Sequence, residues 1–136
     1  MSQDLVRFSI AMPQDLLDEF DALVARRGLA QNRSEVVRDL VRAALVEEEC
    51  DDPNASVMGT LTIVFNHHAS DLQEKLDHIQ HDHFGQIVST MHVHLDAHNC
   101  LEVIVLRGAA GLVQEIADRI LGTKGVKHGK LVLTTA

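Results

Sequence analysis

The sequence is poor in aromatic residues, since its 136 residues include four phenylalanines and no tryptophan or tyrosine. Hydrophobic residues still make up 46%, which is too many for a disordered chain, so the core must consist mainly of Leu, Val, Ile and Ala. No apolar run approaches the ~20 residues of a membrane helix. The N-terminal residues lack the basic and apolar stretches of a secretory signal. We therefore expect a cytoplasmic protein with no membrane partner.

Cysteine is also scarce, whereas histidine is concentrated in one part of the chain. Two cysteines, Cys50 and Cys100, cannot make a disulfide framework, so in the cytosol each is a free thiol, a core residue or a metal ligand. The first 66 residues contain no histidine, and the rest contain nine, at positions 67, 68, 78, 81, 83, 92, 94, 98 and 128. Such clustering of imidazoles indicates metal binding.

Positive charge is limited as well. The formal net charge of −8 argues against a broad basic surface for nucleic acids. The first third of the chain has more acids than bases, but its bases are all arginines, at positions 7, 26, 27, 33, 38 and 42. Any DNA binding must therefore depend on a few well-placed arginines.

The N-terminal third is predicted to contain one strand and two helices. Residues 6–11 alternate with a period of two, which predicts a strand whose more polar face carries Arg7, Ser9 and Ala11. A helix follows Pro13 and ends at Gly28. A second helix starts at Asn32, whose side chain can cap it, and Glu35 sits at the reciprocal position of the capping box. So small a unit cannot bury a core alone and needs a partner chain.

The remainder of the chain is predicted to be a second domain. The predicted order is strand, helix, strand, strand, helix, strand, at residues 56–65, 70–79, 86–95, 100–106, 109–121 and 126–134. This order is the ferredoxin-like βαββαβ arrangement, with helices on one face of the sheet and the other face free to pair with another subunit. The whole chain is then α+β, with domains at residues 1–50 and 56–136 and a linker at 51–55.

Two imidazoles and a thiol are predicted to converge in the second domain. His92 and His94 lie at i and i+2 of a strand, so their side chains point to the same face. Cys100 starts the next antiparallel strand after a short turn and should meet that face. The end of the preceding helix offers further donors, at His78, His81 and His83. Imidazole and thiolate suit Ni(II), Cu(II) or Zn(II), and the residues alone do not choose among them.

The two halves, in this order, resemble the NikR family of nickel-responsive regulators. The most specific part is His92-Val93-His94 followed by Cys100-Leu101-Glu102, and residues 32–35 and 125–129 add to it. The resemblance implies a ribbon-helix-helix that dimerises through its strand, and an ACT-type domain that assembles a homotetramer as a dimer of dimers. It also implies one Ni(II) per subunit in a square-planar shell, held by His92, His94 and Cys100 of one subunit and His81 of another.

The same resemblance implies repression of nickel-uptake genes through operator double-stranded DNA. Two paired strands would enter the major groove with Arg7, Ser9 and Ala11, and Arg7 is the expected base reader. Arg33 and Ser34 would contact phosphate. Acidic residues that help to hold a second cation in the family are matched by Glu35 and Asp39. The family commonly has Arg, Thr and Thr on the strand, so Ala11 is a departure and leaves the operator sequence open.

Other classes of function remain to be weighed. A ribbon-helix-helix regulator could sense another transition metal such as Cu or Zn, or an amino acid, although the predicted ligand set argues against an amino acid. A metallohydrolase needs an open coordination position and a general base, whereas four protein ligands close the shell. We therefore expect no enzyme. His67 and His68 follow a strand and are expected to face solvent, and Cys50 is expected to be a free thiol.

Overall fold

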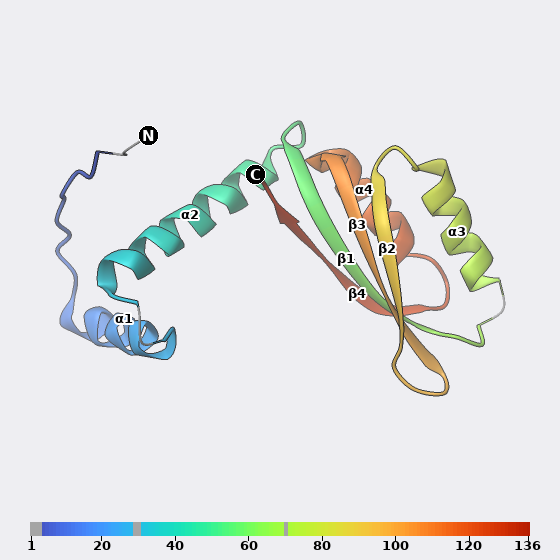
Figure 1. Ribbon diagram of the computed structural model, residues 1–136, viewed down its shortest axis with the longest axis horizontal. Coiled ribbons are helices and arrows are strands. Elements are labelled where there is room, and N and C mark those ends of the chain that lie inside the picture. The colour runs from blue at the N-terminus through green and yellow to red at the C-terminus, as the bar shows by residue number, and fades with distance from the viewer. Residues whose placement is uncertain (1–3, 29–30, 70) are drawn as a thin grey trace. The chain divides into compact units, whose positions relative to one another are not determined.

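A computed structural model describes residues 4–28, 31–69 and 71–136 (Figure 1). The chain forms two compact units, Met1–Arg42 and Ala43–Ala136. No helix in the described part of the chain combines the length and the apolar character needed to cross a bilayer.

The N-terminal unit consists of an irregular segment followed by two helices, α1 (Gln14–Arg26) and the first part of α2 (Arg33–Asp51). Residues 4–13 belong to no helix or strand, so the strand predicted at residues 6–11 is not formed in the single chain. A strand requires a neighbour for its backbone N–H and C=O groups, and one copy offers this segment none. Four of its large apolar side chains stay between 62% and 86% exposed, namely those of Leu5, Val6, Phe8 and Ile10.

The start of α2 has the predicted capping box. The backbone N–H of Glu35 donates to Oδ1 of Asn32 at 3.0 Å, and the N–H of Asn32 donates to Oε2 of Glu35 at 3.3 Å. These two bonds satisfy donors that a helix N-terminus leaves unpaired. Val36, one residue further on, is fully buried. The local sequence therefore determines where this helix begins.

The C-terminal unit has the predicted ferredoxin-like order, with elements β1 (Ser56–Asn66), α3 (Leu72–Asp82), β2 (Ile87–His94), β3 (Asn99–Ala109), α4 (Ala110–Leu121) and β4 (Val126–Thr134). The strands form one antiparallel sheet in the order β2-β3-β1-β4. The predicted helix start at Ser70 lies outside the described residues. The two helices lie over the same face of the sheet (Figure 1). The predicted α+β class is confirmed.

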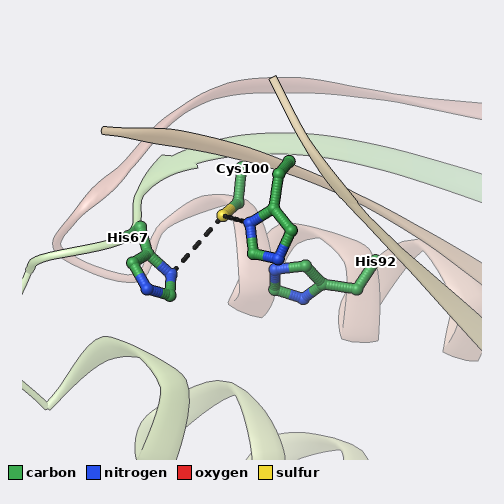
Figure 2. Close-up of side chains that lie close together, drawn as sticks. His67, His92 and Cys100 are labelled. Carbon is green, nitrogen blue, oxygen red and sulfur yellow. Dashed lines mark hydrogen bonds between the residues drawn. The ribbon is translucent and has the colours of Figure 1, made fainter. Parts of the chain in front are cut away.

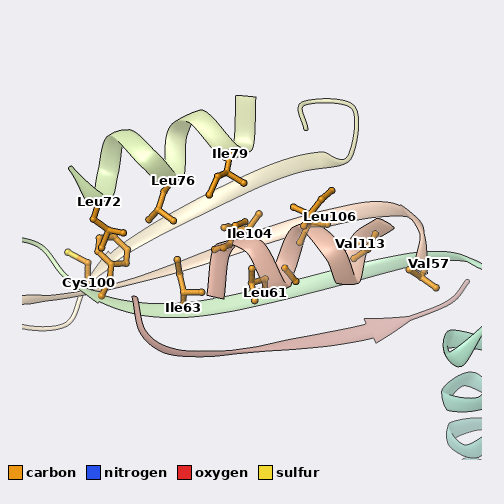
Figure 3. Close-up of a cluster of buried hydrophobic side chains, with 14 of the residues drawn as sticks. Val57, Leu61, Ile63, Leu72, Leu76, Ile79, Cys100, Ile104, Leu106 and Val113 are labelled. Atoms are coloured by element: carbon orange, nitrogen blue, oxygen red, sulfur yellow. The ribbon is translucent and has the colours of Figure 1, made fainter. Parts of the chain in front are cut away.

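The core lies between that face and the two helices (Figure 3). Alternate residues of β1 and β3 point into it and meet the apolar stripe of α3, which is formed by Leu72, Leu76 and Ile79. Phe65 is the only aromatic residue of this buried cluster. The opposite face of the sheet carries half-exposed apolar side chains, including Met58, Met91, Val93 and Val132.

The residues after α2 are held against the start of α4. The N–H of Ala110 donates to the carbonyl of Ala55 at 2.8 Å, and that of Gly111 donates to the carbonyl of Pro53 at 2.9 Å. A Cβ on Gly111 would lie 3.1 Å from Cβ of Pro53, so glycine permits this close approach. Backbone N–H groups in the first turn of α4 thus find acceptors outside the helix.

Gly129 of β4 is predicted to be essential for close packing. A Cβ at this position would collide with the carbonyl oxygen of Thr62 and would lie 2.7 Å from Cδ2 of Leu121. Gly129→Ala should lower the free energy of unfolding by about 1–3 kcal/mol, the usual cost of overpacking. Denaturant unfolding measures this, with Gly85→Ala as the control, because nothing lies within 4 Å of a Cβ there. Equal stability of the two variants would contradict the prediction.

Candidate metal centre

The β2–β3 hairpin brings the three predicted donors together. In its register His94 lies opposite Cys100 and His92 lies opposite Glu102, so these side chains share the inner face. Sγ of Cys100 lies 3.4 Å from Nδ1 of His94, and the rings of His92 and His94 have centroids 5.4 Å apart. Cys100 is fully buried, whereas both histidines are exposed. The backbone therefore gathers two imidazoles and a thiol at the edge of the core.

The hairpin turn is stabilised by Asp96. Its carboxylate accepts hydrogen bonds from the side-chain amide of Asn99 at 2.9 Å and from the backbone N–H groups of His98 and Asn99 at 2.7 and 2.8 Å. These bonds, with the Asn99 side chain first, lower the pKa of Asp96 to about 2. A lowered pKa means that the stabilisation is complete above the ordinary pKa near 4 and is lost as the pH falls towards 2. At neutral pH the ionised Asp96 therefore stabilises the turn that joins the strands of His94 and Cys100.

The structure adds His67 to the cluster (Figure 2). Nδ1 of His67 lies 3.6 Å from Sγ of Cys100, and one donor atom from each of His67, His92, His94 and Cys100 lies within 4.8 Å of all the others. The ring of His67 is exposed, as predicted, but sequence reasoning missed its neighbours. The neighbours of His67 follow from the register of the sheet: β1 runs one residue beyond its predicted end and pairs Asn66 with Asn99, which brings the next residue beside the hairpin.

His81 lies elsewhere in the single chain. It is exposed in the last turn of α3 and is not part of the cluster. The adjacent Gln80 donates through Nε2 to Oε1 of Glu102 at 3.1 Å, which fastens the end of α3 to β3. The other two histidines suggested as donors have different neighbours: Nε2 of His78 lies 3.7 Å from Asp82, and Nε2 of His83 lies 3.4 Å from Arg119.

The donor set fits a transition metal of the nickel, copper or zinc type. Three imidazole nitrogens and one thiolate are ligands that these ions accept, and the four donor atoms are already close. A further group lies beside them: Glu102 is 4% exposed, and its Oε2 has no hydrogen-bond partner within the described chain. Buried carboxylates commonly orient metal-ligating histidines. The arrangement can therefore bind a metal ion and hold its ligands in place.

Comparison with known proteins favours one of these metals. Residues 58–134 match the NikR C-terminal nickel-binding domain, and residues 6–48 match the ribbon-helix-helix protein of the copG family. The chain belongs to the NikR family. A nickel-responsive regulator of Trichlorobacter lovleyi is 56% identical over 133 residues, covering 98% of this chain and 95% of that protein. Those of Geobacter sp. M21 and Thermococcus onnurineus are 55% and 48% identical, covering 97% and 96% of this chain and 94% of each relative.

Membership of the NikR family confirms several predictions. The chain has a DNA-binding ribbon-helix-helix domain followed by a nickel-binding domain, and it is a nickel-responsive regulator and not an enzyme. Nickel is therefore favoured over copper or zinc as the metal that the protein senses.

The residues predicted to bind DNA lie on the irregular N-terminal segment and at the start of α2. Arg7, Ser9 and Ala11 lie exposed on the N-terminal segment, and Ser34 is exposed at the start of α2. Arg33 is already engaged, because its guanidinium donates two hydrogen bonds of 2.7 Å to the carboxylate of Asp21. That pairing lowers the pKa of Asp21 and raises the pKa of Arg33. A phosphate bound by Arg33 would share the guanidinium with Asp21.

The residues expected at the second cation site are also engaged within the chain. Glu35 takes part in the capping box, and Oδ1 of Asp39 lies 3.3 Å from Nη1 of Arg42. They line an open hollow of about 470 Å³ together with Gln31, Arg38 and Arg42. Two arginines at this hollow offset the charge of the two carboxylates.

Proposed function

We propose that this NikR-family chain is a nickel-dependent, sequence-specific repressor of nickel-uptake genes. The observation that carries the proposal is the hairpin that gathers His92, His94 and Cys100 on one face of the sheet. The proposed division is a DNA-binding domain at residues 1–50, a linker at 51–55, and a nickel-binding and tetramerisation domain at 56–136. Its DNA target would place the protein in the cytoplasm.

One Ni(II) per subunit would be held by three ligands from one chain and one from another. His92, His94 and Cys100 supply two imidazoles and the thiolate, and His81 of a second subunit supplies the third imidazole. Two observations support this role of His81. It is exposed on the last turn of α3, and the neighbouring Gln80 is hydrogen-bonded to Glu102. The bound ion would supply a positive charge that joins two subunits.

Two exposed apolar surfaces support a homotetramer. The uncovered sheet face includes Met91, Val93 and Val132, which are 40–59% exposed, and apolar patches of this kind mark interfaces. The second surface is the N-terminal segment, whose alternate side chains, Val6, Phe8 and Ile10, suit a strand paired with that of another copy. Two different self-complementary surfaces on one chain generate a dimer of dimers.

Nickel would act by stabilising one arrangement of the tetramer. A ligand shifts an equilibrium only by its difference in affinity for the two states. A shell closed by His81 exists only when α3 of one subunit meets the hairpin of another, so nickel favours that arrangement. The DNA-binding ribbons would then be restricted in position. Couplings of this kind typically amount to about 1–3 kcal/mol, or about 5–150-fold in DNA affinity.

The paired N-terminal segments would enter the major groove of the operator. Arg7 would read a base, with Ser9 and Ala11 beside it, because a two-stranded ribbon fits this groove. Arg33 and Ser34 at the start of α2 would contact phosphate, which positions the protein without reading sequence. Glu35 and Asp39 would hold a second cation if Arg42 releases Asp39.

Transcription from a nickel-uptake promoter tests the proposal. The purified chain should reduce transcript levels when Ni(II) is added, and the metal-free chain should not. Equal amounts of Cu(II) or Zn(II) test the alternative that another metal is sensed. Sedimentation of the protein should give the mass of four chains. Transcription that rises with nickel, or that does not change, would contradict the repressor assignment.

Glu102 is predicted to strengthen nickel binding without being a ligand. It lies opposite His92, and its free oxygen can accept the ring N–H that a metal-bound imidazole retains. Glu102→Gln keeps the volume but turns an NH₂ group towards that N–H. Nickel affinity, measured by competition with a chelator, should fall about 10–100-fold. Glu115→Gln, at an exposed position of α4, serves as the control. Equal affinities would show that Glu102 has no such role.

A further inference from the structure

The four-donor cluster contains a histidine that the proposed nickel shell does not use. We propose that His67 is an alternative fourth ligand, which completes a metal site within a single chain and competes with His81 of a second subunit. This inference rests on the proposed function, because it concerns the same three donors, His92, His94 and Cys100. The site would suit an ion with a tetrahedral preference, such as Zn(II), which the protein would bind without forming the link between subunits.

The spacing of the donors supports a tetrahedral shell. With Zn–S and Zn–N bonds of about 2.3 and 2.05 Å, sulfur and nitrogen lie about 3.5 Å apart at tetrahedral angles and about 3.1 Å apart at right angles. Sγ of Cys100 lies 3.4 Å from Nδ1 of His94 and 3.6 Å from Nδ1 of His67. Both distances lie nearer to the tetrahedral value. The single chain therefore presents its sulfur and two of its nitrogens near the separation of a tetrahedral zinc shell, and all four donor atoms lie within 4.8 Å of one another.

His67 is placed by the sheet and not by a loose loop. Its backbone N–H donates to the carbonyl of His98 at 2.7 Å and thus extends the pairing of β1 with β3. Its ring packs edge-on against that of His94, with centroids 5.7 Å apart and planes at 81°. The ring next to it in sequence, that of His68, is instead directed to the hairpin turn, where its Nε2 lies 3.1 Å from the carbonyl oxygen of Ala97.

Metal discrimination follows from the competition between the two histidines. Four ligands from one chain give zinc its preferred closed shell. An ion held in that way leaves His81 free, so it does not favour the arrangement that binds DNA. Nickel with three nitrogens and one sulfur favours a planar shell, which requires His81 in place of His67. His67 would therefore divert zinc from the response to nickel.

Affinity measurements on the full-length chain and its variants test this inference. Kd values for Zn(II) and Ni(II) are obtained by competition with a chromophoric chelator, and the absorption bands of bound Co(II) report the coordination shell. His67→Ala should raise the ratio of nickel to zinc affinity at least about tenfold and should alter the Co(II) spectrum. His81→Ala should lower the same ratio. The control is His68→Ala, which removes the neighbouring imidazole and should leave the ratio unchanged.

Three outcomes would overturn the inference. In the first, His67→Ala retains the zinc affinity and the Co(II) spectrum of the natural chain. In the second, His67→Ala loses nickel affinity and zinc affinity equally. In the third, His68→Ala changes the ratio of nickel to zinc affinity as much as His67→Ala does. Circular dichroism shows whether each variant folds, and His67→Gln, which keeps a polar side chain, provides a second variant. Failure of the proposed function can be told apart from failure of this inference. If the proposed function is wrong, nickel will have no effect on DNA binding by the natural chain. The zinc and cobalt measurements still test His67 in that case.

Discussion

Replacing Cys100 with alanine should abolish nickel-dependent DNA binding. Its Sγ is the one sulfur atom in the cluster, and it lies 3.4 and 3.6 Å from ring nitrogens of His94 and His67. Removing a group that hydrogen-bonds to a metal ligand lowers the metal affinity about 10–100-fold, and removing the ligand itself should lower it further. A nickel concentration that saturates the natural chain should therefore leave Cys100→Ala metal-free and bound to DNA only weakly. Fluorescence anisotropy of labelled operator DNA measures the effect.

Cys50→Ala is the matched control for this experiment. Cys50 is half-buried, and burial, with a smaller effect from Glu49 and Asp51, raises the pKa of its thiol. The raised pKa disfavours the thiolate that binds metal, and Cys50 lies outside the donor cluster formed by His67, His92, His94 and Cys100. The response of Cys50→Ala to nickel should match that of the natural chain. A normal nickel response from Cys100→Ala would mean that the hairpin does not hold the metal.

Replacing Arg7 with alanine should remove the preference for the operator. A bidentate contact between an arginine and guanine contributes about 1–3 kcal/mol of discrimination, and each paired ribbon would contain two copies of Arg7. The ratio of operator affinity to random-DNA affinity should therefore fall by at least about 30-fold. Binding to random DNA should persist because it depends on phosphate contacts, including those proposed for Arg33 and Ser34.

Arg26→Ala is the control for Arg7→Ala, since it removes the same charge from the same unit at an exposed position of α1. The loss of a charge alone weakens operator and random DNA alike, so the ratio of the two affinities should stay unchanged in this variant. An unchanged ratio for Arg7→Ala as well would show that Arg7 reads no base.

Much of the fold could be predicted because its determinants are local. The strongly apolar run of β1 and the reciprocal capping of Asn32 and Glu35 depend on residues close in sequence, and the structure has both the strand and the capping box. The convergence of His92, His94 and Cys100 was predictable for the same reason, since two same-face positions and one short turn determine it. The N-terminal strand was not formed, because its hydrogen bonds require a second chain.

The features that sequence reasoning missed depend on contacts between distant residues. His67 meets Cys100 only because β1 and β3 pair in one particular register, which periodicity alone does not fix. The pairing of Arg33 with Asp21 joins two helices across 12 residues. The burial of Glu102 depends on how the end of α3 packs on the sheet, where Gln80 contacts it. Patterns within one element do not determine such contacts.

The affinity of the natural chain for operator DNA, measured with and without one equivalent of Ni(II) per chain at fixed salt, tests most directly whether the metal controls the protein. The proposed metal shell, which joins two subunits, predicts a nickel-bound affinity at least about fivefold higher. Equal affinities for the metal-free and nickel-loaded protein would contradict it.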